Sequence, residues 1–498
     1  MTKYIKTPLR CALLATAAIF TLTACGGGDI DTPGDTSVVI NTGGGADPVV
    51  PITPSADVDL VAGECSAGTT LTVISNASGT VETCSIDAPI AGNVSLDPSI
   101  GYVIEGAVFV GEDTASGGAA ANLNVPAGTT IFGSGGEDFI VVSRGSTIQA
   151  TGTASDPIIM TSIQDIQGTV DPINDRGLWG GLILNGFAPQ NDCISATAVG
   201  GTAACEAAGE GGSGLFGGGN PADNSGTLQF LQVRFAGNQI SGTNELNGIS
   251  FQGVGNGTTC DHLQVHNNQD DGIEFFGGTV NCSFLALTGN ADDSLDYTDG
   301  WTGSAQFVLV EHGPGAGDQG FEFDNNGNDN DALPRSNPTI ANYTLIGNEA
   351  AAAPTSDVGA LIREGTAGTF CNGVITGFTD GGVDIDQTAT FAQITAGDLT
   401  FESALLDNDT NIISGDSSET FDTAASIGGM PNVTEGTVSL VDDFFPGANE
   451  SAVTPCDLTV EAADADLDID NVSYIGAFGP TESPASSWAT GWTFGLFD

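Results

Sequence analysis

Residues 270–275 read Asp-Asp-Gly-Ile-Glu-Phe, and the pattern returns at 292–297 as Asp-Asp-Ser-Leu-Asp-Tyr. Further copies begin at residues 246, 318 and 380, with a weaker one at 357. Each copy ends in an apolar–polar–apolar triplet, the period-two signal of a strand with one buried face. A second short strand recurs between copies, as at 263–265 and 285–287, and Gly or Asn turns follow most of these strands. The stretch therefore predicts a regular succession of strands and turns.

A repeat of about 22–26 residues built from short strands predicts a solenoid. In a parallel β-helix each coil lies about 4.8 Å above the last, so equivalent inward residues form continuous columns. The two predicted columns are Ile249, Ile273, Leu295, Phe321, Val383 and Phe251, Phe275, Tyr297, Phe323, Ile385. Aromatic residues stacked on aromatic residues favour this register. Leucine-rich repeats share the repeat length, but their Leu/Asn consensus is absent. We therefore predict an all-β, right-handed parallel β-helix over residues 57–498.

The first residues have the features of an export signal. Lys3, Lys6 and Arg10 precede an apolar stretch that is too short to span a bilayer. The stretch ends in Leu22-Thr23-Ala24-Cys25, which resembles a bacterial lipobox. We expect residues 1–24 to be a signal peptide, Cys25 to carry the lipid, and residues 25–56 to be a flexible tether. An ordinary secretory signal is the alternative. Because residue 26 is Gly rather than Asp, the resemblance implies the outer membrane, at the cell surface or on the periplasmic face.

The charge of the chain excludes one class of partner. Without residues 1–24, the chain has 63 acidic residues, five arginines and no lysine, a formal charge of −58. Such a surface repels nucleic acid and attracts cations. We therefore expect no nucleic-acid partner.

The exported part contains eight cysteines besides Cys25, an even number that suggests disulfides. Cys260 and Cys282 lie one coil apart, so their Cα atoms fall near the distance that a disulfide needs. We predict the bridge Cys260–Cys282. Proximity in sequence favours Cys65–Cys84 and Cys193–Cys205, and Cys371 and Cys456 are then left over.

Two segments depart from the repeat. Residues 190–226 are rich in Gly and Ala and predict a disulfide-pinned loop insertion. Residues 474–498 end in Trp488, Trp492, Phe494 and Phe497. Because the last coil of a solenoid must be covered, we expect a C-terminal aromatic cap there, with a binding platform as the alternative.

Three sequence features together resemble exported bacterial lipoproteins of the right-handed parallel β-helix (pectin-lyase-like) type. They are Arg176-Gly177-Leu178-Trp179-Gly180-Gly181-Leu182, the 270–300 repeat with Asp270-Asp271-Gly272, and the closing Tyr474-Ile475-Gly476-Ala477-Phe478. The resemblance covers roughly residues 125–498. It implies a fold and an exported location, and it implies no established activity.

The outward positions of the repeat are strongly acidic. One predicted column is Ser250, Glu274, Asp296, Glu322 and Asp384, and beside it run Asp270, Asp292, Asp318, Asp380 with Asp271 and Asp293. Stacked carboxylates repel one another unless water, protons or cations relieve the strain. Ca²⁺ accepts six to eight oxygens, so we predict a Ca²⁺ site. The predicted ligands are Asp270, Asp271, Glu274, Asp292, Asp293, Asp296, Asp318, Glu322 and Asp324. The oxygen-rich loop 324–331 could contribute, and the alternative is a solvated acidic face.

Paired carboxylates also suggest a glycan-cleaving enzyme. Asp271 and Asp293 on neighbouring coils could reach the separation at which glycosidases place their acid and base. The Gly-His-Gly and Arg-x-Lys motifs of polygalacturonase-like enzymes are absent, however. A lyase would need a basic residue, for which only Arg234 and Arg363 are candidates, and structural ion pairing is the simpler role for each. Core packing is likewise the simpler role for Trp179 and Trp301, and His312 is expected to be solvated.

These observations lead to two hypotheses. The first is a cation-binding β-helix scaffold, anchored to the outer membrane, that binds glycan or another surface component. The second is a hydrolase or lyase that cleaves polysaccharide with Asp271 and Asp293.

Overall fold

The structure is a computed structural model that describes residues 58–59, 65, 71–76, 79–241, 244–351, 355–413 and 430–497. Contacts divide the chain into a unit of residues 1–43 and a unit of residues 44–498, and every described residue belongs to the second. The expected signal peptide, Cys25 and the tether lie outside the described residues. Among the described helices, none has the length and apolarity needed to cross a membrane.

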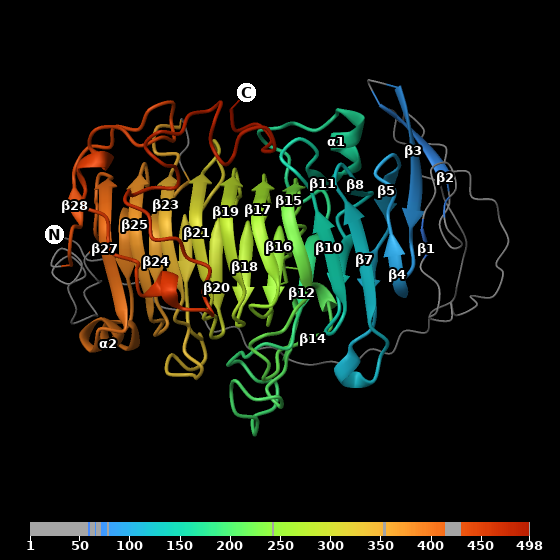
Figure 1. The fold of residues 1–498 in the computed structure, drawn as a ribbon, viewed down its shortest axis with the longest axis horizontal. Helices are drawn as coiled ribbons and strands as arrows, with labels where there is room; N and C mark the ends of the chain where they lie inside the picture. The colour runs from blue at the N-terminus through green and yellow to red at the C-terminus, as the bar shows by residue number, and fades with distance from the viewer. Residues whose placement is uncertain are drawn as a thin grey trace, which may run out of the picture. The chain divides into compact units, whose positions relative to one another are not determined.

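The second unit is an all-β solenoid (Figure 1). One sheet has nine parallel strands, one from each successive coil. They are β6 (Ala107–Val110), β9 (Phe139–Val142), β12 (Gly181–Asn185), β16 (Ile249–Gln252), β18 (Ile273–Phe276), β20 (Leu295–Thr298), β22 (Phe321–Phe323), β24 (Val358–Ile362) and β26 (Gly381–Ile385). The prediction of a parallel β-helix is confirmed.

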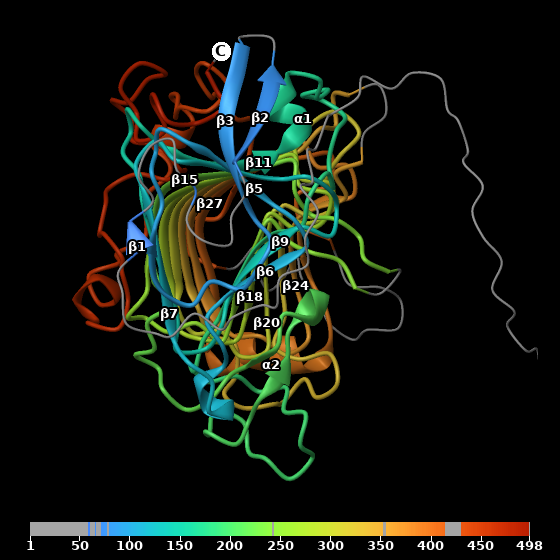
Figure 2. The same cartoon turned by 90° about the vertical axis from the view of Figure 1, so that its right-hand side faces the viewer.

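A second sheet of 17 strands forms the other sides of the coil. Its first strands are β1 (Val58–Asp59), β2 (Leu71–Asn76), β3 (Gly79–Ile86), β4 (Gly92–Ser95), β5 (Gly101–Ile104), β7 (Ala121–Pro126), β8 (Thr130–Gly133), β10 (Thr147–Thr151) and β11 (Ile158–Ser162). Its later strands are β15 (Gly226–Arg234), β17 (Thr259–His266), β19 (Asn281–Thr288), β21 (Ser304–Glu311), β23 (Thr339–Ile346), β25 (Gly368–Thr376), β27 (Leu399–Asp407) and β28 (Thr434–Glu435). Two short helices, α1 (Ile163–Gln167) and α2 (Thr388–Ala396), interrupt the coils. Figure 2 shows the strands of successive coils one behind another.

The long strands each turn a corner in the middle. β10 and β11 are separate strands, yet both pair with β15, so β15 covers two sides of the coil. The corner residue falls out of the register: Gln229 pairs with Asp261, and Leu231 pairs with Leu263. The skipped residues, Phe230 and His262, have positive φ angles of 47° and 54°. Phe284 and Phe307 occupy the same corner in the next coils, also with positive φ. A column of aromatic residues, each with a left-handed backbone conformation, therefore runs along the solenoid.

The predicted register is confirmed, and the structure inserts one further coil into the predicted columns. Ile249 pairs with Ile273, Ile273 with Leu295, and Leu295 with Phe321. The weaker copy at 357 forms β24, so Ala360 lies between Phe321 and Val383. The same insertion places Leu361 between Glu322 and Asp384, which interrupts the acidic column.

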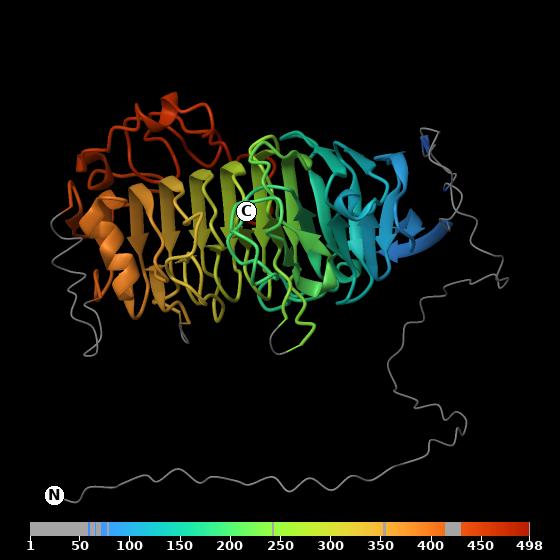
Figure 3. The same cartoon turned by 90° about the horizontal axis from the view of Figure 1, so that it is seen from below.

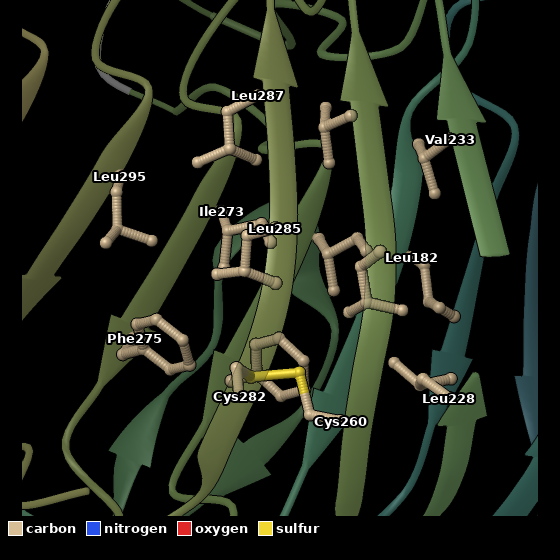
Figure 4. Close-up of a cluster of buried hydrophobic side chains, with 14 of the residues drawn as sticks. Leu182, Leu228, Val233, Cys260, Ile273, Phe275, Cys282, Leu285, Leu287 and Leu295 are labelled. Carbon is tan, nitrogen blue, oxygen red and sulfur yellow. A yellow bond between two sulfur atoms is a disulfide. The ribbon is translucent and has the colours of Figure 1, made fainter. Parts of the chain in front are cut away.

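The core follows the stacked columns (Figure 4). The rings of Phe251 and Phe275 stack at 5.1 Å, and Trp301 stacks on Phe275 at 4.1 Å. Trp179 and Trp301 are both fully buried, which confirms core packing as their role. Cys260 and Cys282 form the predicted disulfide inside the coil, with 4.6 Å between their Cα atoms. The bridges Cys65–Cys84 and Cys193–Cys205 are also present, and Cys371 pairs with Cys456.

The chain leaves the solenoid between β12 and β15. This excursion contains the Cys193–Cys205 bridge and a small antiparallel hairpin of β13 (Ala207–Ala208) and β14 (Leu215–Phe216). Arg144 fastens it to the coil, because its guanidinium contacts both Glu206 and Asp113. The excursion thereby covers part of the nine-stranded sheet's outer face.

The C-terminal aromatic segment differs from expectation. It does not lie over the last coil but runs back along the side of the helix, as the red trace in Figure 3 shows. Thr344 on β23 contacts Ala477, Gln264 on β17 binds the backbone of Phe494, and Gln232 on β15 binds the backbone of Trp492. Trp488 and Trp492 lie against His262 in the corner column. The segment covers the rings of this column, which would otherwise present a large apolar surface to water.

Candidate cation site

The predicted acidic residues gather on the outer face of the nine-stranded sheet. Glu274 on β18 pairs with Asp296 on β20, which pairs with Glu322 on β22. The turns that lead into these strands contribute the remaining acids. We call this set the acidic row: Asp270, Asp271, Glu274, Asp292, Asp293, Asp296, Asp318 and Glu322. It lies on parallel strands because each coil repeats the same triplet.

Much of the row is buried rather than solvated. The exposed fractions of Asp271, Glu274 and Asp293 are 8%, 8% and 5%. Asn247 covers one end, since its Nδ2 donates to Glu274 at 2.6 Å and to Glu210 at 3.1 Å. Glu210 belongs to the excursion between β12 and β15, so that segment closes over the acids. The acidic row is therefore not a fully solvated face.

Three overlapping groups of carboxylates could each surround a metal ion. In each group, one oxygen from every member lies within 4.8 Å of the others. The groups are Glu245, Asp270, Asp292; Asp271, Asp292, Asp293; and Asp271, Glu274, Asp296. Six of the predicted ligands are thus brought together. Asp318, Glu322 and Asp324 lie outside these groups.

Burial and mutual repulsion both oppose ionisation of the row. Burial, followed by the charges of Glu245 and Asp292, raises the pKa of Asp270 to about 7. Burial also raises the pKa of Glu210 to about 8, with Asp270 and Glu245 adding repulsion. The pKa values of Asp271, Glu274, Asp293 and Asp296 are raised well above the ordinary range for the same two reasons. Near neutral pH the row must therefore hold protons or a bound cation.

Unused oxygens remain inside the row. Oδ1 of Asp296 is buried and has no hydrogen-bond partner among the described residues. Oδ1 of Asn247 is also buried without a hydrogen-bond partner among the described residues, and Asn247 is only 1% exposed. A buried polar atom without a partner costs roughly 1–3 kcal/mol. Carboxylate and amide oxygens in excess are the ligands that Ca²⁺ prefers, so the residues present fit a calcium ion.

Asp271 and Asp293, the pair considered for glycan cleavage, both support the backbone. Oδ1 of Asp271 accepts the amide of Asp293 at 3.0 Å, and Oδ1 of Asp293 accepts the amide of Gln319 at 2.7 Å. Each carboxylate therefore links its coil to the next one. This geometry gives both residues a structural role, and their use in catalysis stays a prediction.

Arg363 closes the other end of the row. Its guanidinium contacts Glu322, and its Nε lies 3.0 Å from Oδ1 of Asp324. The expectation of a structural ion pair for Arg363 is confirmed, because this residue directly follows β24, which pairs with β22. Glu322 and Asp324 are thus ion-paired. In the loop 324–331, the side chains of Asn325 and Asn326 bind other groups of the protein, which fixes the loop.

Arg234 and His312 also make contacts that support the fold. Arg234 contacts Asp165 and lies over the ring of Phe494, 4.0 Å from its centroid. His312 is 5% exposed and its Nδ1 lies 2.7 Å from Ser356 Oγ, so the expectation of a solvated His312 was wrong. The cause is the weak repeat copy at 357, since the chain leading into it covers the histidine.

Two acids of the site were not predicted. Glu245 precedes the first repeat copy, and Glu210 lies in the Gly-rich excursion, so neither belongs to a repeated position. The position of Glu245, one residue before the first repeat copy, could have indicated from the sequence that it belongs to the site. Only the tertiary structure could bring Glu210 to the row.

The comparisons with known proteins agree with this geometry. The family model described as "Pectate-lyase like beta helix domain" matches residues 88–493. The chain belongs to this family. The match includes the acidic row, the excursion and most of the C-terminal segment of this β-helix domain. No curated protein and no solved structure matched the chain.

Proposed function

We propose that this pectate-lyase-like β-helix is a cation-binding scaffold, held at the outer membrane through Cys25, that presents its sides to glycans. The observation that carries the proposal is the meeting of three overlapping carboxylate groups around Asp271 and Asp292, in which Asp271, Glu274 and Asp293 are buried. Like charges about 4.8 Å apart repel by roughly 3 kcal/mol at an effective dielectric of 20. A divalent cation would convert this repulsion into attraction.

Calcium suits the row better than magnesium. Ca²⁺ tolerates irregular oxygen shells, whereas Mg²⁺ demands an octahedron and keeps its water. The carboxylates here are fixed by strand register and by backbone hydrogen bonds, so they cannot rearrange freely. Asp271, Asp292 and Asp293 would form the centre of the site, with Glu274 and Asp296 beside them.

Thermal unfolding of chelator-treated protein tests the proposal. A ligand at a hundredfold excess over its Kd adds about 2.7 kcal/mol to the free energy of unfolding. Millimolar Ca²⁺ should therefore raise Tm by a few degrees over NaCl of equal ionic strength, with a smaller effect of Mg²⁺. The double variant Asp292→Asn, Asp293→Asn should lose the calcium-specific part.

A matched control separates the site from general screening. Asp398 and Asp409 are exposed and belong to none of the three groups. The variant Asp398→Asn, Asp409→Asn should keep the full calcium response. Equal Tm values in Ca²⁺ and in matched NaCl would reject the cation site.

A further inference from the structure

A hollow lies on a different side of the solenoid from the acidic row. It has a volume of about 530 Å³ and lies where strands of the 17-stranded sheet begin. The turns of successive coils form one wall, and residues 460–467 of the C-terminal segment line the other. We call it the polar groove. The acidic row belongs to the nine-stranded sheet, so the two sites do not share residues.

The coil wall of the groove presents polar groups at regular intervals. Thr339 begins β23 and pairs with Thr369 on β25, so their side chains lie one coil apart. Thr279 and Thr302 lie in the preceding turns, each two residues before a paired strand position. The groove therefore repeats hydroxyl groups along the axis of the helix.

Several of these hydroxyl groups are unused. The hydroxyls of Thr302, Thr339 and Thr369 make no hydrogen bond to the described part of the chain, so they are available to solvent or a ligand in the groove. Thr339 is only 6% exposed, so its side chain is held in place by its surroundings, while its hydroxyl stays accessible from the groove that the residue lines.

The opposite wall combines acceptors with an apolar edge. Glu461, Asp464 and Asp466 line it, and Oε2 of Glu461 is buried without a hydrogen-bond partner among the described residues. Val460 lies at the rim and is 77% exposed, more than any other large apolar side chain among the described residues. The residues that line the groove include no basic side chain.

We propose that the polar groove binds a neutral glycan chain lying along the axis of the solenoid. Sugar hydroxyls both donate and accept hydrogen bonds, so they match the threonine hydroxyls on one wall and the carboxylates on the other. Val460 would cover the apolar face of a sugar ring. A uronate chain is excluded because its carboxylates would meet Glu461, Asp464 and Asp466 with no cation between them. The inference rests on the glycan-binding part of the proposed function and gives that part a location.

Isothermal titration of the full chain in EDTA tests the groove. The probes are neutral oligosaccharides of β-1,4-glucan, β-1,3-glucan, β-1,4-xylan and β-1,4-mannan, with oligogalacturonate as the charged comparison. At least one neutral probe should bind, and oligogalacturonate should not. Thr302→Val with Thr339→Val removes two hydroxyls at nearly constant volume and should weaken binding about tenfold.

Two further variants make the result specific. Thr400 continues the column of Thr339 and Thr369 one coil beyond the groove, so Thr400→Val should bind like the unaltered protein. Val460→Glu changes an exposed residue and should also weaken binding. The proposal is overturned if no neutral probe binds, if the threonine double variant binds normally, or if oligogalacturonate binds as tightly. Because EDTA is present throughout, failure of the calcium site would leave this result unchanged.

Discussion

Arg363 shows how one side chain sets the charge of a buried row. It contacts Glu322 and Asp324, while the acids on the other coils of the row have no ion pair among the described residues. Its guanidinium thus gives one end of the row an ion pair, while burial still raises the pKa of Glu322 to about 7. None of the three carboxylate groups includes Glu322.

Replacing this guanidinium should be costly. Arg363→Gln leaves Glu322 and Asp324 close together without a counter-charge, so we expect a loss of about 1–3 kcal/mol in the free energy of unfolding. Denaturant unfolding in EDTA measures the loss. Asp331→Asn is the control, because it breaks only the pair between Arg335 and the 78% exposed side chain of Asp331, and such pairs contribute little. Equal losses in the two variants would contradict the assigned role.

Cys25 is the residue on which the proposed location depends. We expect Cys25→Ala to move the protein from the outer-membrane fraction to the soluble fraction, because the acyl chains alone hold it there. Cell fractionation followed by immunoblotting measures the distribution. Unchanged fractionation would remove the lipid anchor from the proposal.

At the scale of the element, the strands β18, β20 and β22 impose their spacing on the acids. Backbone register fixes Glu274, Asp296 and Glu322 one above another, and the side chains cannot move apart to relieve repulsion. Burial by the excursion after β12 increases the repulsion by removing water. The strain of the row is therefore a property of stacked strands and not of any single residue.

This strain predicts a dependence of stability on pH. The pKa of Asp270 is raised to about 7 and that of Glu210 to about 8, so the folded protein binds protons more tightly than the unfolded chain. Stability in EDTA should then fall as pH rises from about 4, the pKa of unfolded carboxyl groups, to about 8. Tm measured across this range should decrease.

Calcium should reverse the trend at the upper end of the range. It competes with protons for the same oxygens, so its stabilising effect should be largest near pH 8 and small near pH 5. The same Tm series in millimolar Ca²⁺ gives the comparison. A calcium effect that is independent of pH would place the ion away from the row.

At the scale of the whole molecule, the C-terminal segment covers a seam of the solenoid. The rings of Phe230, His262, Phe284 and Phe307 stack along the corner, with neighbouring centroids 4.3–4.8 Å apart. Trp488 and Trp492 lie across this column, and Gln232 and Gln264 hold the segment's backbone. The segment therefore protects an apolar stripe from water.

Removing the two tryptophans should expose this stripe without dismantling the coils. We expect Trp488→Ala with Trp492→Ala to increase binding of a hydrophobic dye and cleavage by protease near the C-terminus. Truncation of the buried Trp492 removes about 3–5 kcal/mol of local contact, and truncation of the partly buried Trp488 removes less. The far-ultraviolet circular dichroism should stay unchanged, since the strands pair independently of the segment. Trp492→Phe serves as the conservative control. Global unfolding of the double alanine variant would show that the segment belongs to the core.

The sequence by itself determined the repeating part of the protein. The triplets at 249–251, 273–275 and 295–297 predicted strand, inward face and register, because each feature depends only on alternation and on the length of one coil. The Cys260–Cys282 bridge followed from the same length. The predicted ligands Asp271, Asp292 and Asp293 came together for the same reason.

Only the tertiary structure decided what lies across the coils. Glu210 reaches the row from an excursion with no period, Arg363 comes from a coil whose copy is weak, and the aromatic C-terminus lies on the corner column instead of the last coil. These contacts join segments up to 260 residues apart, as in the bond between Gln232 and Trp492. Periodicity carries no information about such contacts, because they depend on which apolar or charged surface each non-repeating segment can cover.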